Sequence, residues 1–285
     1  MTPPSNQVTD QGRIKVGLAL SGGGTRGLAH IGVLKVFERE GVPVDFLAGA
    51  SMGGVIAAGY AVGMSPSDLE AEAKKLSRLR SVFRLADPGL PNAGLLRGDR
   101  LQAYFESKLG DHMFKDLGRP LALIAVDLNS REEVIFQEGS VALALRATTS
   151  VPGLFMPLET NGKRLVDGGV LNNLPVDVVR KMGADVVIAV DVDPDPEDIA
   201  SGWQGQYRWM PDGLARTFVV LDEATSLMMR VIQEGRLQRD PPDVILQPQL
   251  PSGLNFFTGY NKTEELVRAG ELAAELMLGE IRELL

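Results

Sequence analysis

Short apolar runs alternate along the chain with segments in which apolar residues recur every three or four positions. A run rich in valine, isoleucine, leucine and alanine that is bounded by glycine or polar residues is typical of a buried strand. Runs of this kind predict strands at residues 14–20, 45–48, 120–128, 184–191 and 244–248. Residues 133–136 are predicted to pair with the third run, and residues 164–166 to be short and extended.

The segments between these runs carry the spacing of amphipathic helices. The pattern predicts helices at residues 27–41, 52–62, 66–79, 100–109, 140–149, 175–182, 214–237 and 263–285. Because continuous apolar strands alternate with helices, we expect an α/β fold with helices on both faces of a central, mostly parallel sheet. Two irregular stretches, 86–98 and 194–213, are expected to be surface loops.

Length and composition narrow the class of protein. The 285 residues suit one large domain, and we predict a single domain over residues 14–285 after a disordered, polar lead at residues 1–13. The absence of cysteine excludes disulfides, thiolate zinc sites and a thiol nucleophile. The net charge of −8 argues against nucleic acid as a partner. No run is apolar for long enough to span a bilayer, so we expect a cytoplasmic protein and leave a peripheral place at the inner face of the membrane open.

A glycine-rich loop follows the first predicted strand and opens the first predicted helix. Gly22, Gly24 and Gly27 fit the pattern G-x-G-x-x-G, in which glycines allow unusual backbone angles and close approach. The amides of a helix start attract negative charge, which is either the pyrophosphate of a dinucleotide or the oxyanion of a tetrahedral intermediate. Asp45 would hold the ribose of a dinucleotide, but it opens the second predicted strand instead of closing it. The oxyanion interpretation is therefore favoured.

The second predicted strand leads into Gly49-Ala50-Ser51-Met52-Gly53, which fits G-x-S-x-G. In this elbow, formed here between Gly49 and Gly53, a sharp strand-to-helix turn lifts the serine oxygen clear of the backbone. Two adjacent parallel strands, one ending in amide donors and one in a serine, would bring these parts to one edge of the sheet. The sequence therefore predicts acyl transfer with Ser51 as the nucleophile.

A serine nucleophile normally transfers its proton to a histidine, and this chain has only two. His30 falls within the first predicted helix, where a hydrogen-bonded helix histidine is the simpler interpretation. His112 lies in the polar connection “LGDHMFKDLG” and is the second candidate base. The third alternative is that no histidine takes part and a carboxylate acts alone.

Three aspartates, Asp127, Asp167 and Asp191, lie at or just after predicted extended segments. Because parallel strands present their carboxyl ends at one edge of a sheet, each of the three could reach Ser51. Two glycines follow Asp167 and let the backbone turn sharply, whereas the other two aspartates more often cap a turn. An aspartate has an ordinary pKa of about 3.9, so we expect an apolar surrounding to raise the pKa of Asp167.

Three motifs in this order resemble the patatin-like phospholipase family. They are “GGGTRG” in the glycine loop, “GASMG” at the elbow and “DGG” at residues 167–169. The stretches “VDLNSREEVIFQEG”, “LRATTSVPGLFMP” and “DGGVLNNLPV” are similar to the family as well. The resemblance covers residues 14–193 and implies a patatin-like, three-layer αβα fold.

The resemblance also implies a Ser–Asp dyad, with Ser51 as nucleophile and Asp167 as general base. The backbone amides that would form the oxyanion hole belong to Gly22, Gly23, Gly24 and Thr25. Arg26 would support this loop or contact a phosphate. The implied activity is hydrolysis of acyl esters in lipids, of phospholipase A or lysophospholipase type, through an acyl-serine intermediate, with no cofactor and no metal.

Other functions stay open at this point. They are acyl transfer to an alcohol on the same dyad, nucleotide binding at the glycine loop, and a non-catalytic scaffold that keeps the fold. The natural lipid and its acyl-chain length do not follow from the motifs, because every such ester presents the same carbonyl group.

Two segments bear on how a lipid or acyl-ester substrate would be reached. Lys74–Arg84 carries five basic residues among apolar ones, which fits either a solvated helix face or a contact with anionic headgroups. Trp203–Met210 contains both tryptophans of the chain and fits a lid, a dimer contact, a membrane-dipping edge or core packing. A peripheral membrane surface and a homodimer therefore stay open as partners.

Overall fold

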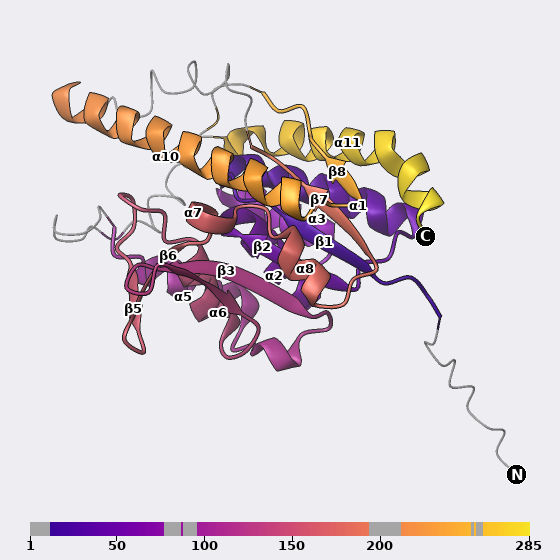
Figure 1. Cartoon of the computed structure of the whole chain (residues 1–285), viewed down its shortest axis with the longest axis horizontal. Helices are drawn as coiled ribbons and strands as arrows, with labels where there is room; N and C mark the ends of the chain where they lie inside the picture. Colours follow the sequence, from indigo (N-terminus) through magenta and orange to yellow (C-terminus); the bar gives the residue numbers. More distant parts are fainter. Residues whose placement is uncertain (1–11, 77–86, 88–95, 194–211, 252–253, 255–258) are drawn as a thin grey trace, which may run out of the picture.

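A mixed sheet of eight strands forms the centre of the computed structural model, which describes residues 12–76, 87, 96–193, 212–251, 254 and 259–285 (Figure 1). The strands are β1 (Val16–Leu20), β2 (Phe46–Ala50), β3 (Leu121–Asp127), β4 (Glu132–Phe136), β5 (Leu158–Thr160), β6 (Lys163–Asp167), β7 (Val186–Val190) and β8 (Val244–Leu246). Their order in the sheet is β5-β6-β3-β2-β1-β7-β8, and β4 also pairs with β3.

Helices follow most of these strands. The α-helices are α1 (Ala29–Glu40), α2 (Ser51–Val62), α3 (Pro66–Leu76), α5 (Asp99–Leu109), α6 (Val141–Thr148), α7 (Gly169–Asn172), α8 (Val176–Lys181), α10 (Asp212–Arg239) and α11 (Thr263–Glu283). Short 3₁₀ turns are η1 (Gly24–Leu28), η2 (Phe114–Asp116) and η4 (Tyr260–Lys262). None of the helices described here is both long and apolar enough to cross a membrane.

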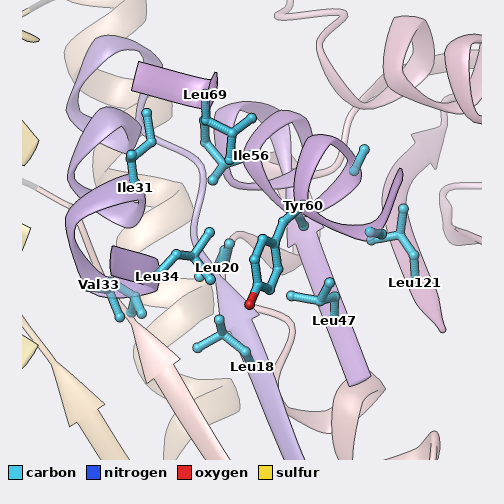
Figure 2. Packing of buried hydrophobic residues seen from close by; sticks show 14 of the residues in the cluster. Leu18, Leu20, Ile31, Val33, Leu34, Leu47, Ile56, Tyr60, Leu69 and Leu121 are labelled. Carbon is cyan, nitrogen blue, oxygen red and sulfur yellow. The ribbon is translucent and has the colours of Figure 1, made fainter. Parts of the chain in front are cut away.

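The two faces of the sheet are covered by different helices, because successive strand residues point to opposite sides. On one face, Val16, Leu18 and Leu20 pack with α1, α2, α6 and α11 in a large cluster, part of which Figure 2 shows. On the other face, Ala19 belongs to a cluster with the apolar residues of α8. Gly17 lies on this second face, where a Cβ atom would overlap the side chain of Val179. The three-layer αβα arrangement expected from the sequence is confirmed.

The sheet has a parallel part and an antiparallel part. The pairs β1–β2, β1–β7, β2–β3 and β7–β8 are parallel, as the sequence predicts. Strand β4 pairs antiparallel with β3, which confirms the pairing expected for residues 133–136. Strands β5 and β6 form an antiparallel hairpin, and β6 runs antiparallel to β3.

Strands β2 and β6 lie end to end along the same side of β3. Residues 123 and 124 of β3 pair with both β2 and β4, and residues 125–127 pair with both β4 and β6. A strand has only two sides, so β4 occupies one of them while β2 and β6 share the other. Ala50, the last residue of β2, pairs with Ile124, and Asp167, the last residue of β6, pairs with Ala125. The two strand ends therefore meet at neighbouring positions of β3.

Some sequence expectations fall on residues that the structure does not describe. The loops expected at residues 86–98 and 194–213 lie largely outside the described residues, and the segment Trp203–Met210 lies wholly outside them. Most of the expected lead at residues 1–13 is also outside, and its last residue, Arg13, donates a hydrogen bond to Asp45 at 3.0 Å. The single domain over residues 14–285 stays a prediction.

Candidate active site

Ser51 is the first residue of α2 and follows directly on β2. Its φ angle is 50°, in the left-handed region that side chains other than glycine rarely adopt. Its amide donates a hydrogen bond to Oγ1 of Thr148 at 2.9 Å. The residue is only 6% exposed. A serine held in strained backbone at a strand-to-helix turn is the geometry that the elbow motif predicts.

The glycines of the elbow allow α2 to start directly against the sheet. A Cβ atom on Gly53 would overlap the carbonyl oxygen of Leu20, the last residue of β1. A Cβ atom on Gly49 would lie 2.6 Å from the carbonyl carbon of Gly53. Any larger residue at either position would push α2 away, so the backbone contact that fixes the position of Ser51 requires glycine.

Asp167 is buried at the end of β6, close to Ser51. Its amide donates to the carbonyl of Ser150 at 3.0 Å, and its Oδ1 accepts a hydrogen bond from the Gly169 amide at 2.8 Å. Burial raises the pKa of Asp167 to about 6, against smaller opposing effects from the Ser51 side chain and the Gly169 amide. Among the described residues, Oδ2 accepts no hydrogen bond of regular geometry. Hydrogen bonds between catalytic groups are often long or poorly aligned before a substrate binds.

The route by which Asp167 reaches Ser51 differs from the one that the sequence suggested. We expected the carboxyl ends of parallel strands to bring the two residues to one edge of the sheet. Instead, β6 is antiparallel to β3, and Asp167 approaches the end of β2 head-on, since Ala50 and Asp167 pair with the successive residues Ile124 and Ala125. Side-chain contacts across the sheet thus depend on the register of β6 against β3.

The glycine loop lies next to this pair. Gly24 has a φ angle of 56°, which favours glycine, and it begins η1. The Gly22 amide donates to the carbonyl of Asn173 at 3.2 Å, so this amide is already used. Gly23 and Gly24 stand where the amides of a helix start have no partner within the helix. A Cβ atom on Gly22 would lie 3.0 Å from Cβ of Ser51, which shows how closely the loop approaches the elbow.

Thr25 and Arg26 complete the predicted loop. Thr25 is buried within η1, and Gly259 lies so close that a Cβ atom there would be 2.5 Å from Oγ1 of Thr25. Arg26 is half-buried, and its charge acts on the carboxylate of Asp193, which follows β7. Arg26 thus faces the end of a neighbouring strand.

Each of the two histidines forms a hydrogen bond to a backbone carbonyl. Nε2 of His30 donates a hydrogen bond to the carbonyl of Ser21 at 2.8 Å, and burial lowers the pKa of His30 to about 4. The ring is therefore neutral near pH 7 and holds the end of β1, as the simpler interpretation predicts. His112 is bonded through Nδ1 to the carbonyl of Leu109, at the end of α5.

The other candidate carboxylates also serve local structure. Asp127 accepts hydrogen bonds from the amides of Asn129 and Arg164 at 3.1 Å and 3.0 Å, which is the turn-capping role expected for it. Asp191 accepts from the Asp193 amide at 3.1 Å. Asp45 precedes β2, at the edge of the sheet opposite the glycine loop, and accepts from the Val16 amide at 2.8 Å. It is therefore in the wrong place to hold the ribose of a dinucleotide.

Three polar residues near the site have no assigned role in the sequence prediction. Thr148 accepts the Ser51 amide, as described above. The backbone carbonyl of Asn173 accepts a hydrogen bond from the Gly22 amide, and its side-chain Nδ2 donates to Oε1 of Gln233 at 3.1 Å. The buried Arg146 donates to the carbonyls of Arg97 and Met156, the latter at 3.0 Å. All three residues lie in the stretches “LRATTSVPGLFMP” and “DGGVLNNLPV”, which resemble the family. The resemblance marks these stretches but does not show which residue contacts which.

A cavity of about 140 Å³ opens beside Ser51. It lies between α2, α3, α5 and α6, and most of the residues around it are apolar. The lining includes Ser51, Val55, Ile56, Gly59, Met64, Leu69, Glu72, Tyr104 and Lys108. In the part of the chain that the structure describes, no cluster of three or more histidine, aspartate or glutamate side chains could hold a metal ion.

The described part of the basic segment Lys74–Arg84 is neutralised locally. Lys74 pairs with Glu70 at 2.9 Å and with Glu264 at 2.7 Å, and Lys75 pairs with Glu72 at 2.9 Å. The rest of the segment lies outside the described residues. These two lysines give little support to a headgroup contact.

Comparison with known proteins places this geometry in a family. The family model for patatin-like phospholipases matches residues 18–180. An uncharacterised NTE family protein of Mycobacterium tuberculosis is 35% identical over 190 residues, which are 67% of this chain and 52% of that protein. Lysophospholipase NTE1 of Yarrowia lipolytica is 31% identical over 282 residues, which are 94% of this chain and 20% of that protein. The chain thus spans about half or less of these relatives' lengths.

A solved structure shares the fold. VipD from Legionella pneumophila superposes with a TM-score of 0.51 at 13% sequence identity, over 94% of this chain and 67% of that one. The glycine loop, the serine elbow and the aspartate at the end of β6 all fall within the matched residues 18–180. The chain belongs to the patatin-like phospholipase family.

Proposed function

We propose that this chain hydrolyses acyl esters of lipids through a covalent acyl-serine intermediate. Ser51 is the nucleophile and Asp167 the general base in this proposal. The amides of Gly23 and Gly24 are the main donors to the oxyanion, because the Gly22 amide is already bonded to Asn173. The reaction needs no cofactor, since serine, carboxylate and amides supply the nucleophile, the base and the charge stabilisation.

The first half of the reaction forms the acyl-enzyme. Asp167 accepts the proton of the Ser51 hydroxyl while Oγ attacks the ester carbonyl carbon. The carbonyl oxygen becomes an oxyanion and accepts hydrogen bonds from the glycine-loop amides. When the tetrahedral intermediate collapses, the bond to the alcohol breaks and Asp167 returns its proton to the departing oxygen.

The second half releases the fatty acid. Asp167 accepts a proton from water, and the water oxygen attacks the acyl carbon of the ester on Ser51. The new tetrahedral intermediate collapses by breaking the bond to Oγ, and Asp167 protonates Ser51. One water is consumed, one alcohol and one carboxylic acid are formed, and the dyad returns to its starting state.

The observation that carries this proposal is the meeting of a strained serine and a buried carboxylate. A pKa of about 6 leaves Asp167 about nine-tenths ionised at pH 7, yet makes it a stronger base than an ordinary aspartate. Ser51 stands at the neighbouring strand end and lines the cavity. The apolar cavity provides room for the acyl chain on the same side.

The family supports the substrate class. One relative is named a lysophospholipase, and we therefore propose lysophospholipids and related monoacyl esters as substrates. Because the proposed substrate is a lipid, we also propose that the protein binds to membrane surfaces. Flotation of the protein with anionic and with neutral vesicles tests this binding, and absence of flotation at low salt would exclude it.

The proposal is tested with Ser51→Ala and Asp167→Asn, each assayed on a chromogenic acyl ester. We expect Asp167→Asn to lower kcat/KM by 10²–10⁴-fold, as is usual for a positioned base. Labelling by a fluorophosphonate should occur in the wild type and be lost in Ser51→Ala. Retention of more than about a tenth of the activity in Asp167→Asn would exclude the dyad, because a positioned base contributes more than this. An unlabelled wild type would point to a non-catalytic protein.

A further inference from the structure

The cavity beside Ser51 follows one face of α2 for two turns. Ser51, Val55, Ile56 and Gly59 all line it, which is the spacing of a single helix face. Because a helix rises 1.5 Å per residue, Gly59 lies about 12 Å from Ser51 along the helix axis. An acyl chain attached to Ser51 and running along this face would point its methyl end towards Gly59.

Gly59 leaves room at the far end of this path, and two side chains close it. A Cβ atom on Gly59 would lie 2.6 Å from Cδ2 of Leu69 and 3.5 Å from Sδ of Met64. Figure 2 shows the side chain of Leu69 next to that of Ile56 on α2. Leu69 and Met64 therefore form a wall across the path, and we call Gly59, Met64 and Leu69 together the stop.

The wall between α3 and α5 is closed by polar groups that are already bonded to one another. Glu72 accepts a hydrogen bond from the Tyr104 hydroxyl at 2.9 Å and pairs with Lys108 at 2.7 Å and Lys75 at 2.9 Å. A hydrocarbon chain that left the cavity here would have to break charge-assisted bonds without replacing them, which is unfavourable. An acyl chain that follows α2 away from Ser51 therefore ends at the stop.

Two independent magnitudes give the length of chain that fits. An extended chain with carbon–carbon bonds of about 1.5 Å advances about 1.3 Å per carbon, so the path of about 12 Å holds roughly nine carbons. The cavity volume is about 140 Å³. An engineered cavity of about 150 Å³ in another protein binds benzene, a six-carbon molecule. Both estimates describe a medium-length chain, so among the monoacyl lipid esters proposed as substrates the cavity favours those with medium-length chains.

We propose that the stop formed by Gly59, Met64 and Leu69 makes the enzyme selective for medium-length acyl chains, of about six to ten carbons. This inference rests on the proposed function, because it requires the acyl group to be carried by Ser51. It assigns a specificity-determining role to three residues that do not touch the reacting atoms.

The test is the chain-length profile on 4-nitrophenyl esters with acyl chains of 4, 6, 8, 10 and 12 carbons. We expect the wild type to have its highest kcat/KM at six to ten carbons. Gly59→Ala adds a methyl group against Leu69 at the end of the path and should lower the ratio of the eight-carbon to the four-carbon rate at least tenfold. Leu69→Ala opens the stop and should move the optimum to a longer ester.

The control is Leu34→Ala, because Leu34 is fully buried on α1 and does not line the cavity. It should lose stability as Leu69→Ala does, yet keep the wild-type profile. A flat wild-type profile, or one that neither Gly59→Ala nor Leu69→Ala changes, would overturn the inference while leaving the hydrolase intact. If a fluorophosphonate does not label the wild type, the proposed function is overturned instead.

Discussion

Asp167 holds a carboxyl group in a buried place that favours its neutral form. In the unfolded chain the group loses its proton near pH 4, whereas in the folded chain burial keeps the proton until about pH 6. The folded state therefore binds more protons than the unfolded state between these pH values. By linkage, this residue makes the protein less stable as the pH rises through that range.

This cost predicts that Asp167→Asn is more stable than the wild type at neutral pH. Two pKa units correspond to about 2.7 kcal/mol, so we expect a gain on the order of 2 kcal/mol at pH 7 and almost none at pH 4. Urea unfolding at both pH values measures the difference. A variant that is destabilised equally at pH 4 and pH 7 would contradict a buried, ionised carboxylate.

The same residue should govern the pH dependence of the reaction. The proposed general base acts when it is ionised, so kcat/KM for an uncharged ester should fall tenfold per pH unit below about pH 6. A stopped-flow or spectrophotometric assay between pH 4.5 and pH 8 measures this limb. A profile that stays flat down to about pH 5 would show that burial does not raise the pKa of the proposed base.

Ser51 carries strain of a different kind, in its backbone. A side chain in the left-handed region costs about 1–2 kcal/mol, and glycine does not incur this cost. Both Ser51→Gly and Ser51→Ala remove the hydroxyl, so their comparison isolates the backbone. We expect Ser51→Gly to be more stable than Ser51→Ala by about 1 kcal/mol in urea unfolding. Equal stabilities would mean that the elbow is relaxed.

Helices α1 and α11 cross with almost no side chain between them, and Figure 1 shows them alongside each other. A Cβ atom on Gly270 of α11 would overlap the carbonyl oxygen of Ala29, and one on Gly32 of α1 would overlap that of Val267. Ala29 directly follows η1. The last helix of the chain thus packs against the start of the helix that carries the glycine loop.

This contact predicts opposite effects for two glycines of the same helix. Gly270→Ala should destabilise the protein by about 1–3 kcal/mol, because the added methyl group overpacks a backbone contact. Gly279→Ala is the matched control, since nothing lies within 4 Å of its Cβ position, and it should stabilise by up to about 1 kcal/mol through helix propensity. Thermal unfolding measures the stability of both variants. A stabilised Gly270→Ala would show that helices α1 and α11 are not in backbone contact at this position.

The elements that could be predicted from the sequence are those with a strong apolar period. The run at 184–191 and the helical spacing at 263–285 are both found as elements β7 and α11 within a few residues. Strand β5 was missed because Leu158–Thr160 contains a single apolar residue, and its pairing is supplied by the hairpin with β6. The short helix α7 was missed because it has only four residues and begins with glycine.

The features of the candidate site also divide into those that local sequence predicts and those that it does not. Ser51 and the glycine loop are local motifs, so a few neighbouring residues were enough to predict the elbow and the loop. The antiparallel arrival of Asp167 depends on which stretch of β3 is left unpaired beyond β2, and no local pattern contains that information. The use of the Gly22 amide by Asn173 likewise joins residues far apart in the sequence.

Helix α10 joins the antiparallel part of the sheet to helix α8 through one arginine. Arg236 pairs with Glu133 on β4 and with Asp177 on α8, the latter at 3.0 Å. Asn172, at the end of α7, donates to the same two carboxylates at 3.2 Å and 3.0 Å. The helix therefore fastens the antiparallel strands, the turn after Asp167 and the layer of α8 to one another.

We predict that Arg236→Ala destabilises the protein by about 2 kcal/mol, because it leaves two largely buried carboxylates with fewer partners. Burial acts to raise the pKa of Asp177, but hydrogen bonds from Lys181, Arg236 and Asn172 outweigh it and lower the pKa to about 2. Their contribution to stability is therefore present above pH 4 and lost as the pH falls towards 2.

In Arg236→Ala the pKa of Asp177 lies closer to its ordinary value, so this loss should be smaller and end at a higher pH, which unfolding curves between pH 2 and pH 7 will show. Arg239→Ala is the control, since the described contact of Arg239 is a hydrogen bond to the carbonyl of Gly235 within the same helix. If both variants lose the same stability, the bridge made by Arg236 contributes nothing beyond a surface arginine.

The end-to-end meeting of β2 and β6 on β3 has a consequence for how relatives are compared. Because side chains alternate between the two faces of a sheet, a shift of β6 by one residue would turn the carboxylate to the opposite face and move it about 3.3 Å. A relative with an insertion or deletion in this hairpin could keep all three motifs and still be inactive. Inference of activity from such sequences therefore needs the hydrogen-bond register of β6 as well as the presence of its aspartate.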